Sequence, residues 1–424
     1  MKPSEPLPGN PFRHVRVYPP EEVTRRNEAE CDPAEAGLTR ADVEAIWNAV
    51  VRFYRTGLQP SIALCLRRRG KVVLDRTIGH LVGNEPDLPA DAPRLVASPD
   101  TLYSLMSASK SVTAMLVHLC SERNLLRVDD AVADYIPEFA RHGKHWITIR
   151  HVLTHTAGIP VLPDVELDLD LLADPDRILQ LLCDARPLTP PGRRLAYHAL
   201  TGGYILAEVI RRVTGAEVKE FLEREVLRPL GFRNLNYGVS PAEFGRTAKN
   251  VCTGLRPVFP VSWLLRRALG TGLEEAVRLS NDPRFLTAVV PSGNIHCTAN
   301  EASRFFQLLL NGGQLDGVRV FERATVRRAI GAQSYLAFDF TMWLPVGYGM
   351  GFMLGHEWAS LFGPRAPRAF GHIGFTNLLV WADPERDIAV ALLNNGKPMI
   401  NPDLVWWLNV SRVIAARCPR EVPV

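Results

Sequence analysis

The strand-forming stretches of this chain are split between its two ends, and helical patterns fill the middle. Near the start, residues 61–66 and 71–79 are β-rich and are joined by an Arg/Gly turn, which predicts a hairpin. Near the end, a helix over 402–417 is preceded by four stretches that indicate strands: 347–355, 368–375, 376–382 and 388–394. Strands from both ends predict an α+β fold, an antiparallel sheet flanked by helices with an inserted all-helical lobe.

This order divides the 424 residues into lobes. Residues 1–38 are polar and proline-rich, and we interpret them as an N-terminal extension. We assign residues 39–127 and 290–424 to the sheet lobe and residues 128–289 to the helical lobe. Within the helical lobe, 253–289 is apolar in patches without a clear period. A lid, a helical insertion and a partner surface are all compatible with that pattern.

Two helices are delimited by their end residues. Thr39 is followed three residues later by Asp42, a capping-box-like pair that predicts a helix start. Residues 201–214 have a helical period and are followed by Gly215, the residue type that most often ends a helix.

Composition excludes several classes of protein. Hydrophobic residues make up 46% of the chain and charged residues 22%, which is typical of a globular protein with an ample core. The 49 basic and 45 acidic residues leave a net charge of +4 without a block of one sign, which argues against a nucleic-acid partner. No apolar run reaches the ~18 residues of a membrane span.

Two further features predict a compartment. The first 38 residues lack the apolar segment of a secretory signal. The seven cysteines are scattered without Cys-x-x-Cys pairs, which is typical of reduced thiols. We therefore expect a cytoplasmic protein.

The chain contains one Ser-x-x-Lys sequence, Ser107 to Lys110, at the start of a helical pattern. An apolar stripe follows at helical spacing: Val112, Met115, Leu116 and Leu119. Residues three apart on a helix are neighbours, about 5–6 Å between Cβ atoms, so the amine can reach the hydroxyl. A serine hydroxyl is a weak nucleophile until a base activates it. The tetrapeptide alone is equally compatible with a helix start that carries a surface lysine.

Three more segments follow this one along the chain: 153–160 (LTHTAGIP), 197–201 (YHALT) and 370–376 (FGHIGFT). Together the four segments resemble the serine β-lactamase and penicillin-binding-protein superfamily. The resemblance is closest to its class C-like branch and the family VIII carboxylesterases. It covers about residues 39–415 and implies a β-lactamase/transpeptidase-like fold.

The resemblance implies a role for each matching residue. Ser107 corresponds to the nucleophile and Lys110 to the group that helps activate it. Tyr197 corresponds to the tyrosine that acts as general base or shuttles the leaving-group proton. A phenolate at neutral pH requires a neighbouring cation, for which Lys110 is the candidate.

The third element of the superfamily, Lys-Thr-Gly, corresponds here to His372-Ile373-Gly374. His372 and Gly374 are therefore expected to contact the substrate. The backbone N–H groups of Ser107 and Phe375 are expected to form the oxyanion hole, in which one donor contributes ~3 kcal/mol.

Two positions depart from the lactamase pattern. Ala199 stands where the lactamases have the asparagine that contacts the substrate's amide side chain. His372 stands in place of the lysine, and with an ordinary pKa near 6.5 it is mostly neutral at pH 7. Both departures favour the esterases of the superfamily.

Metal-binding roles for the histidines have little support. His151 and His155 are four apart, like half of a zinc site, but no glutamate lies between them as a metalloprotease motif requires. We expect neither a metal nor a cofactor, and we interpret His155 as structural.

The function predicted is a serine hydrolase, carboxylesterase-like, that cleaves small esters through an acyl-enzyme on Ser107. An acyltransferase would use the same acyl-enzyme, and the sequence does not separate the two. The four segments are also compatible with a weak β-lactamase or D-peptidase and with a non-catalytic penicillin-binding-like protein. The 253–290 stretch is expected to form the wall of the acyl pocket. The sequence does not define the oligomeric state.

Overall fold

The computed structural model describes residues 12–161, 169–358 and 360–421. Within these residues a ten-stranded sheet forms the centre of the molecule, and every pairing in it is antiparallel. Across the sheet the strands follow in this order: β1 (Thr24–Arg26), β3 (Lys71–Val82), β2 (Ser61–Arg68), β15 (Ile388–Asn394), β14 (Leu378–Asp383), β13 (Phe370–Gly374), β12 (Met353–Leu354), β11 (Leu344–Tyr348) and β10 (Ser334–Asp339). A tenth strand, β4 (Leu95–Val96), pairs with β3 alone. The predicted fold, in which both chain ends build one sheet, is confirmed.

The predicted hairpin is β2 and β3, which reverse at Arg69 and Gly70 with φ of +50° and +74°. The prediction of a single strand over 347–355 is wrong, because this stretch contains the end of β11 and the whole of β12. The Gly349 N–H donates to the Phe352 carbonyl at 2.9 Å, and Gly351 has a φ of +97°. This tight turn reverses the chain where the sequence pattern suggested that it continues.

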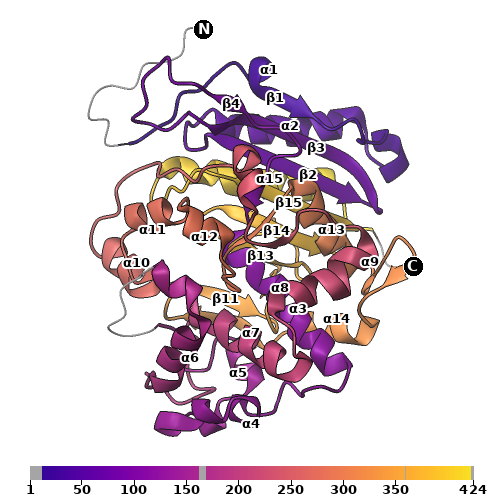
Figure 1. Ribbon diagram of the computed structural model, residues 1–424. Helices are drawn as coiled ribbons and strands as arrows, with labels where there is room; N and C mark the ends of the chain where they lie inside the picture. The colour runs from indigo at the N-terminus through magenta and orange to yellow at the C-terminus, as the bar shows by residue number, and fades with distance from the viewer. Residues whose placement is uncertain (1–11, 162–168, 359, 422–424) are drawn as a thin grey trace.

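Helices cover both faces of the sheet (Figure 1). On one face α2 (Arg40–Tyr54) packs with α15 (Val405–Arg417), and this side buries Leu64, Val390 and Leu392. On the other face lie α13 (Ala299–Leu310) and α3 (Ser109–Glu122). Because alternate strand residues point to opposite faces, β2 and β15 are buried along their whole length. They read in the sequence as continuous apolar runs for this reason.

The capping predictions are confirmed. Thr39 and Asp42 form the reciprocal capping box at the start of α2. The helix α7 (Thr201–Thr214) ends at Gly215, which adopts the left-handed conformation with a φ of +70°. The start of α2 and the end of α7 therefore carry residue types that favour these helix-end conformations.

The remaining elements are α1 (Pro20–Val23), η1 (Pro33–Ala36), β5 (Tyr103–Ser104), η2 (Met106–Ala108), α4 (Val132–Tyr135), η3 (Pro137–Trp146), α5 (Ile149–Leu153), η4 (Asp170–Ala173), α6 (Pro175–Asp184), α8 (Val218–Leu222), η5 (Glu223–Leu227), α9 (Arg228–Leu230), β6 (Asn236–Tyr237), η6 (Pro241–Arg246), α10 (Val261–Leu269), α11 (Leu273–Leu279), α12 (Pro283–Thr287), β7 (Ile295–Cys297), β8 (Gln314–Leu315), β9 (Val318–Arg319), α14 (Arg323–Ile330) and η7 (Pro402–Leu404). Of these, α4, α5 and α6 lie with α7 at the bottom of Figure 1, α10, α11 and α12 lie at its left, and the others are distributed around the sheet.

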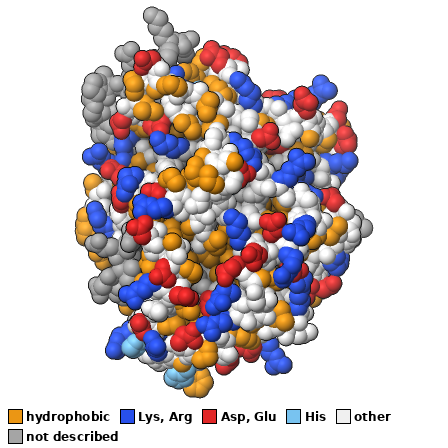
Figure 2. Space-filling model, in the orientation of Figure 1, with side chains coloured by type: hydrophobic (Ala, Val, Ile, Leu, Met, Phe, Trp, Pro, Cys, Tyr) orange, Lys and Arg blue, Asp and Glu red, His pale blue; other side chains and the backbone are white. Residues whose placement is uncertain are grey.

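Part of the predicted extension belongs to the sheet, since β1 pairs with β3, and Val15 and Val23 before it are buried. Residues 1–11 of the predicted extension lie outside the described residues. Among the helices that the structure describes, none is long and apolar enough to cross a bilayer. On the face shown in Figure 2, basic and acidic side chains are interspersed without an extended area of one sign.

Candidate active site

Ser107 lies where a short strand turns into the buried helix α3. The preceding residue, Met106, has a φ of +48°, a conformation that costs a non-glycine residue ~1–3 kcal/mol. The backbone on either side is held to β7: the Leu105 N–H donates to the Ile295 carbonyl at 2.8 Å, and the Ile295 N–H donates to Ser109 Oγ at 3.0 Å. Ser107 itself is partly exposed, whereas its neighbours on both sides are buried. Its hydroxyl is thus presented at a fixed place.

Lys110 lies in the first turn of α3 and is buried. Its Nζ donates to the carbonyl oxygens of Ala199 at 2.7 Å and Ser292 at 3.1 Å. The same nitrogen lies 4.8 Å from the centroid of the Tyr197 ring. Burial, without an ion pair to any described residue, lowers the pKa of Lys110 from 10.5 to about 7. A substantial fraction of this lysine is therefore a neutral amine at neutral pH.

Tyr197 lies on the loop before α7 and is held by its backbone. Its N–H donates to Asp339 Oδ1 at 3.1 Å, and the Asp339 carboxyl also accepts the N–H groups of Thr341 and Met342. Burial raises the pKa of Tyr197, and the nearby hydroxyl of Ser107 offsets this only in part. No side chain or backbone group of the described chain makes a well-aligned hydrogen bond to the Tyr197 hydroxyl. We therefore expect a neutral phenol beside Ser107.

His372 is a buried residue of β13, with its ring centroid 6.1 Å from that of Tyr197. Burial, assisted by the charge of Lys110, lowers the pKa of His372 to about 3. Its Nδ1 lies 2.6 Å from the Ile373 carbonyl, which requires the neutral ring to carry its proton on Nδ1. His372 thus supplies no positive charge at neutral pH.

Gly374 allows β13 to approach the segment that leads to Ser107. A Cβ atom at this position would lie 2.4 Å from the carbonyl oxygen of Leu105. Only a glycine fits such a close backbone approach. The approach brings Phe375, the next residue, to the wall of the cavity that Ser107 also lines.

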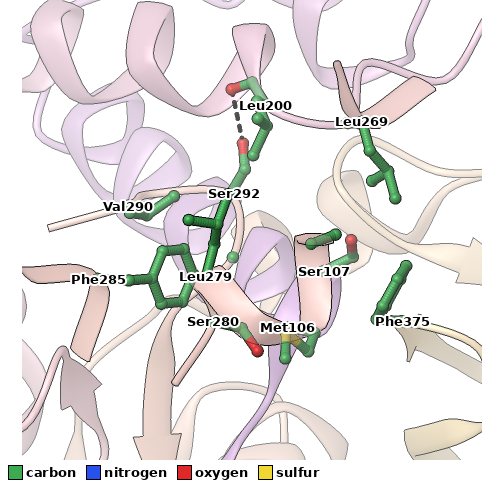
Figure 3. Close-up of a pocket in the computed structure, with 13 residues that line it drawn as sticks. Met106, Ser107, Leu200, Leu269, Leu279, Ser280, Phe285, Val290, Ser292 and Phe375 are labelled. Carbon is green, nitrogen blue, oxygen red and sulfur yellow. Dashed lines mark hydrogen bonds between the residues drawn. The ribbon is translucent and has the colours of Figure 1, made fainter. Parts of the chain in front are cut away.

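An apolar cavity of about 110 Å³ opens beside Ser107 (Figure 3). Ser107 lies near Leu269 and Phe375 in this view, and Phe285 and Val290 line the opposite side. The complete lining is Met106, Ser107, Ala199, Leu200, Leu269, Ala276, Leu279, Ser280, Phe285, Val290, Ser292, Gly293 and Phe375. Five of these come from the stretch 253–289, which folds into three short helices and forms much of the wall.

Two residues of the site carry no sequence signal that we recognised. The Ser292 carbonyl accepts from Lys110, and its Oγ donates to the Leu200 carbonyl at 2.9 Å. Asp339 holds the backbone of Tyr197 from a strand 142 residues further along the chain. A serine in a loop and an aspartate in an aromatic stretch are both too common to stand out. Only the contacts identify them.

Ring nitrogens of His155 and His151 accept hydrogen bonds from the backbone. His155 Nδ1 accepts the His198 N–H at 3.2 Å, and the His155 ring packs 4.6 Å from the Tyr197 ring between centroids. His151 Nδ1 instead accepts the Thr148 N–H at 3.1 Å. The two rings of this i, i+4 pair are therefore engaged by different parts of the backbone.

The chain is similar in sequence and in structure to esterases, β-lactamases and penicillin-binding protein homologues. A family model described as Beta-lactamase matches residues 50–413. The esterase/beta-lactamase LipL of Mycobacterium tuberculosis is 27% identical over 337 residues, which are 75% of each chain. The crystal structure of a family VIII carboxylesterase superposes with a TM-score of 0.75 at 26% identity, over 90% of this chain and 99% of that one. A penicillin-binding protein homologue from Caulobacter crescentus gives a TM-score of 0.74 at 27% identity and the same coverage.

Proposed function

The chain belongs to the β-lactamase family and is a serine hydrolase of that superfamily, and on this basis we propose that it is a carboxylesterase acting through an acyl-enzyme on Ser107. One observation carries the proposal. A buried tyrosine lies beside the Ser107 hydroxyl at an apolar cavity, and the amine of a buried lysine with a pKa lowered to about 7 lies 4.8 Å from the centroid of that tyrosine ring. Perturbed titratable groups that converge on a nucleophile are typical of active sites.

Lys110 is suited to be the terminal proton acceptor. A neutral amine has two N–H donors and one lone pair, and the carbonyls of Ala199 and Ser292 provide acceptors for the two donors. The lone pair then remains to accept a proton. Tyr197, whose ring lies under the amine and whose hydroxyl lies near Ser107, would relay the proton between them.

In the proposed reaction, Ser107 Oγ attacks the ester carbonyl carbon and the carbonyl π electrons move to its oxygen. The serine proton passes through Tyr197 to Lys110. The tetrahedral intermediate then collapses, the bond to the alkoxide breaks, and the same relay returns the proton to the leaving alcohol. Water repeats these steps on the acyl-enzyme, releasing the acid and restoring Ser107.

The intermediate carries a negative oxygen that must be stabilised. We propose that the backbone N–H groups of Ser107 and Phe375 donate to it. The close approach of Gly374 to Leu105 supports this pairing, because it brings the ends of β13 and β5 to one cavity. Removing one such donor costs ~3 kcal/mol of transition-state stabilisation in related chemistry.

The site favours esters over β-lactams. The neutral His372 provides no cation for a carboxylate, and Ala199 provides no side-chain amide for the substrate's acylamino group. A simple ester requires neither contact, whereas the apolar cavity can accept its acyl chain. A site that recognises its substrate by hydrogen bonds loses much of its transition-state binding energy when one partner is missing. An apolar pocket distinguishes substrates by only ~1–3 kcal/mol per methylene.

The test compares kcat/KM for p-nitrophenyl butyrate and for a chromogenic cephalosporin on one preparation, with Ser107→Ala as the blank. We expect a much higher value for the ester, abolished in the variant. A cephalosporin value equal to or above the ester value would refute the carboxylesterase and favour a β-lactamase.

A further inference from the structure

Large apolar side chains are exposed on two segments near the active site. On α10 and the residues before it, Phe259 is 79% exposed and Trp263 is 47% exposed, with Val258 beside them in sequence. On β10 and the β10–β11 connection the exposed rings include Phe338, Phe340 and Trp343. We call these six residues the rim patch: Val258, Phe259, Trp263, Phe338, Phe340 and Trp343.

The two segments of the rim patch meet. A small cavity of about 60 Å³ is lined from one side by Leu264 and Arg267 of α10 and from the other by Phe340 and Thr341. Phe338 packs 5.2 Å from Phe340 between ring centroids, so the aromatic rings of the connection form one cluster.

Arginines accompany these rings, and no acid in the described part of the chain pairs with them. Arg194 lies 4.4 Å from the Phe340 centroid and Arg267 lies 5.5 Å from the Trp263 centroid. Among the described residues neither they nor Arg266 makes an ion pair.

Acidic residues are correspondingly scarce in the same segments. None occurs in residues 186–196 or 253–273, and the only one in 331–345 is Asp339, which is buried. Glu274, the next acid after α10, is already paired with Arg13 and Arg256. The described segments that carry the rim patch are therefore apolar and rich in arginine.

We propose that the rim patch docks on an anionic lipid–water interface. Aromatic rings and arginine side chains are the residue types that insert at the headgroup level, where the rings leave water and the guanidinium groups meet anionic headgroups. A second copy of this chain is a poorer occupant. A two-fold interface over this patch would oppose Arg194, Arg266 and Arg267 to their own copies, and the described segments around them offer no unpaired acid in compensation.

The position of α10 gives docking a consequence for catalysis, and this step rests on the proposed esterase function. One side of α10 exposes Trp263, whereas Leu265 packs with Leu273 and Val277, and Leu269 lines the cavity beside Ser107. A single helix thus borders both the proposed lipid contact and the acyl cavity. Docking would bring an ester dissolved in the lipid to the entrance of the site.

The test is co-sedimentation of the full chain with vesicles of equimolar phosphatidylcholine and phosphatidylglycerol, beside vesicles of phosphatidylcholine alone. We expect binding to the anionic vesicles that weakens as salt is added. Arg194→Gln with Arg267→Gln should reduce the partition coefficient roughly thirtyfold, from about 1 kcal/mol per arginine. Phe259→Ser with Trp263→Ser should reduce it at least about tenfold, because two rings leave the interface.

The matched control is Arg52→Gln with Arg55→Gln, two exposed arginines in the last turn of α2 and directly after it, near the β2–β3 end of the sheet; neither makes an ion pair with a described residue. This control should bind like the wild type. Ser107→Ala should also bind like the wild type, so failure of the esterase proposal leaves this readout intact. Absence of binding to anionic vesicles, or an equal loss in the Arg52/Arg55 control, would refute the proposal. A dimer in light scattering that the rim variants dissociate would assign the patch to a second copy instead.

Discussion

A charge placed beside Lys110 should move the pH dependence of the reaction by a predictable amount. The residue to change is Ala199, since its own carbonyl accepts from Lys110 Nζ at 2.7 Å and it lines the cavity. A carboxylate introduced by Ala199→Asp would lie within the ~4–6 Å at which an opposite charge raises a lysine pKa by about 1–3 units. From a starting pKa of about 7, the new value is roughly 8–10.

The neutral amine of Lys110 is the active form, so the fraction of neutral Lys110 determines how far kcat/KM falls at a given pH. At pH 7 about half of Lys110 is neutral in the wild type. After Ala199→Asp the neutral fraction falls to about one-tenth at a pKa of 8 and about one-thousandth at a pKa of 10. We therefore expect kcat/KM at pH 7 to fall between about fivefold and five-hundredfold and to recover as the pH rises.

The assay is the pH profile of kcat/KM for p-nitrophenyl butyrate, followed at the isosbestic wavelength of p-nitrophenol. This ratio reports ionisations of the free enzyme. The wild type should rise with pH through an inflection near 7, and the Ala199→Asp profile should be displaced to higher pH. Ala199→Asn is the matched control, because it adds nearly the same volume without charge and should keep the inflection in place. An equal displacement in both variants, or none in either, would refute the assignment of this inflection to Lys110.

Three further changes test other parts of the site. Tyr197→Phe should lower kcat by roughly 10²–10⁴ while KM changes little, because only the relay hydroxyl is lost; near-normal stopped-flow acylation would exclude the relay. Lys110→Met should lower kcat similarly and remove the inflection near pH 7, and its persistence in the residual activity would show that another group titrates there. Ala276→Phe should fill part of the cavity beside Leu279. It should abolish the gain of at least about fourfold in kcat/KM per added acyl methylene, whereas an unchanged chain-length series would place the acyl group elsewhere.

Features coded by neighbouring residues could be predicted from the sequence. The capping box at Thr39, the helix end at Gly215 and the β2–β3 hairpin each depend on residues within one or two turns of chain. The start of a buried helix just after Ser107 is of the same kind, because the apolar stripe that predicts it is spaced within a few turns.

Features that depend on distant contacts could not be predicted. The low pKa of Lys110 follows from burial against two carbonyls, of Ala199 and Ser292, which lie 89 and 182 residues away. The clamp that Asp339 forms on Tyr197 spans 142 residues. Residues 253–289 lacked a period because their helices have nine, seven and five residues, shorter than the window in which periodicity is readable.

The most direct test of the account is mass spectrometry of the intact protein and its peptides after reaction with a serine-directed phosphonate. The account predicts one adduct per chain, on Ser107, with none on Ser107→Ala. Labelling should slow below pH 7 as Lys110 becomes protonated. An adduct on any other serine, or unchanged labelling of Ser107→Ala, would contradict the assignment of Ser107 as the nucleophile.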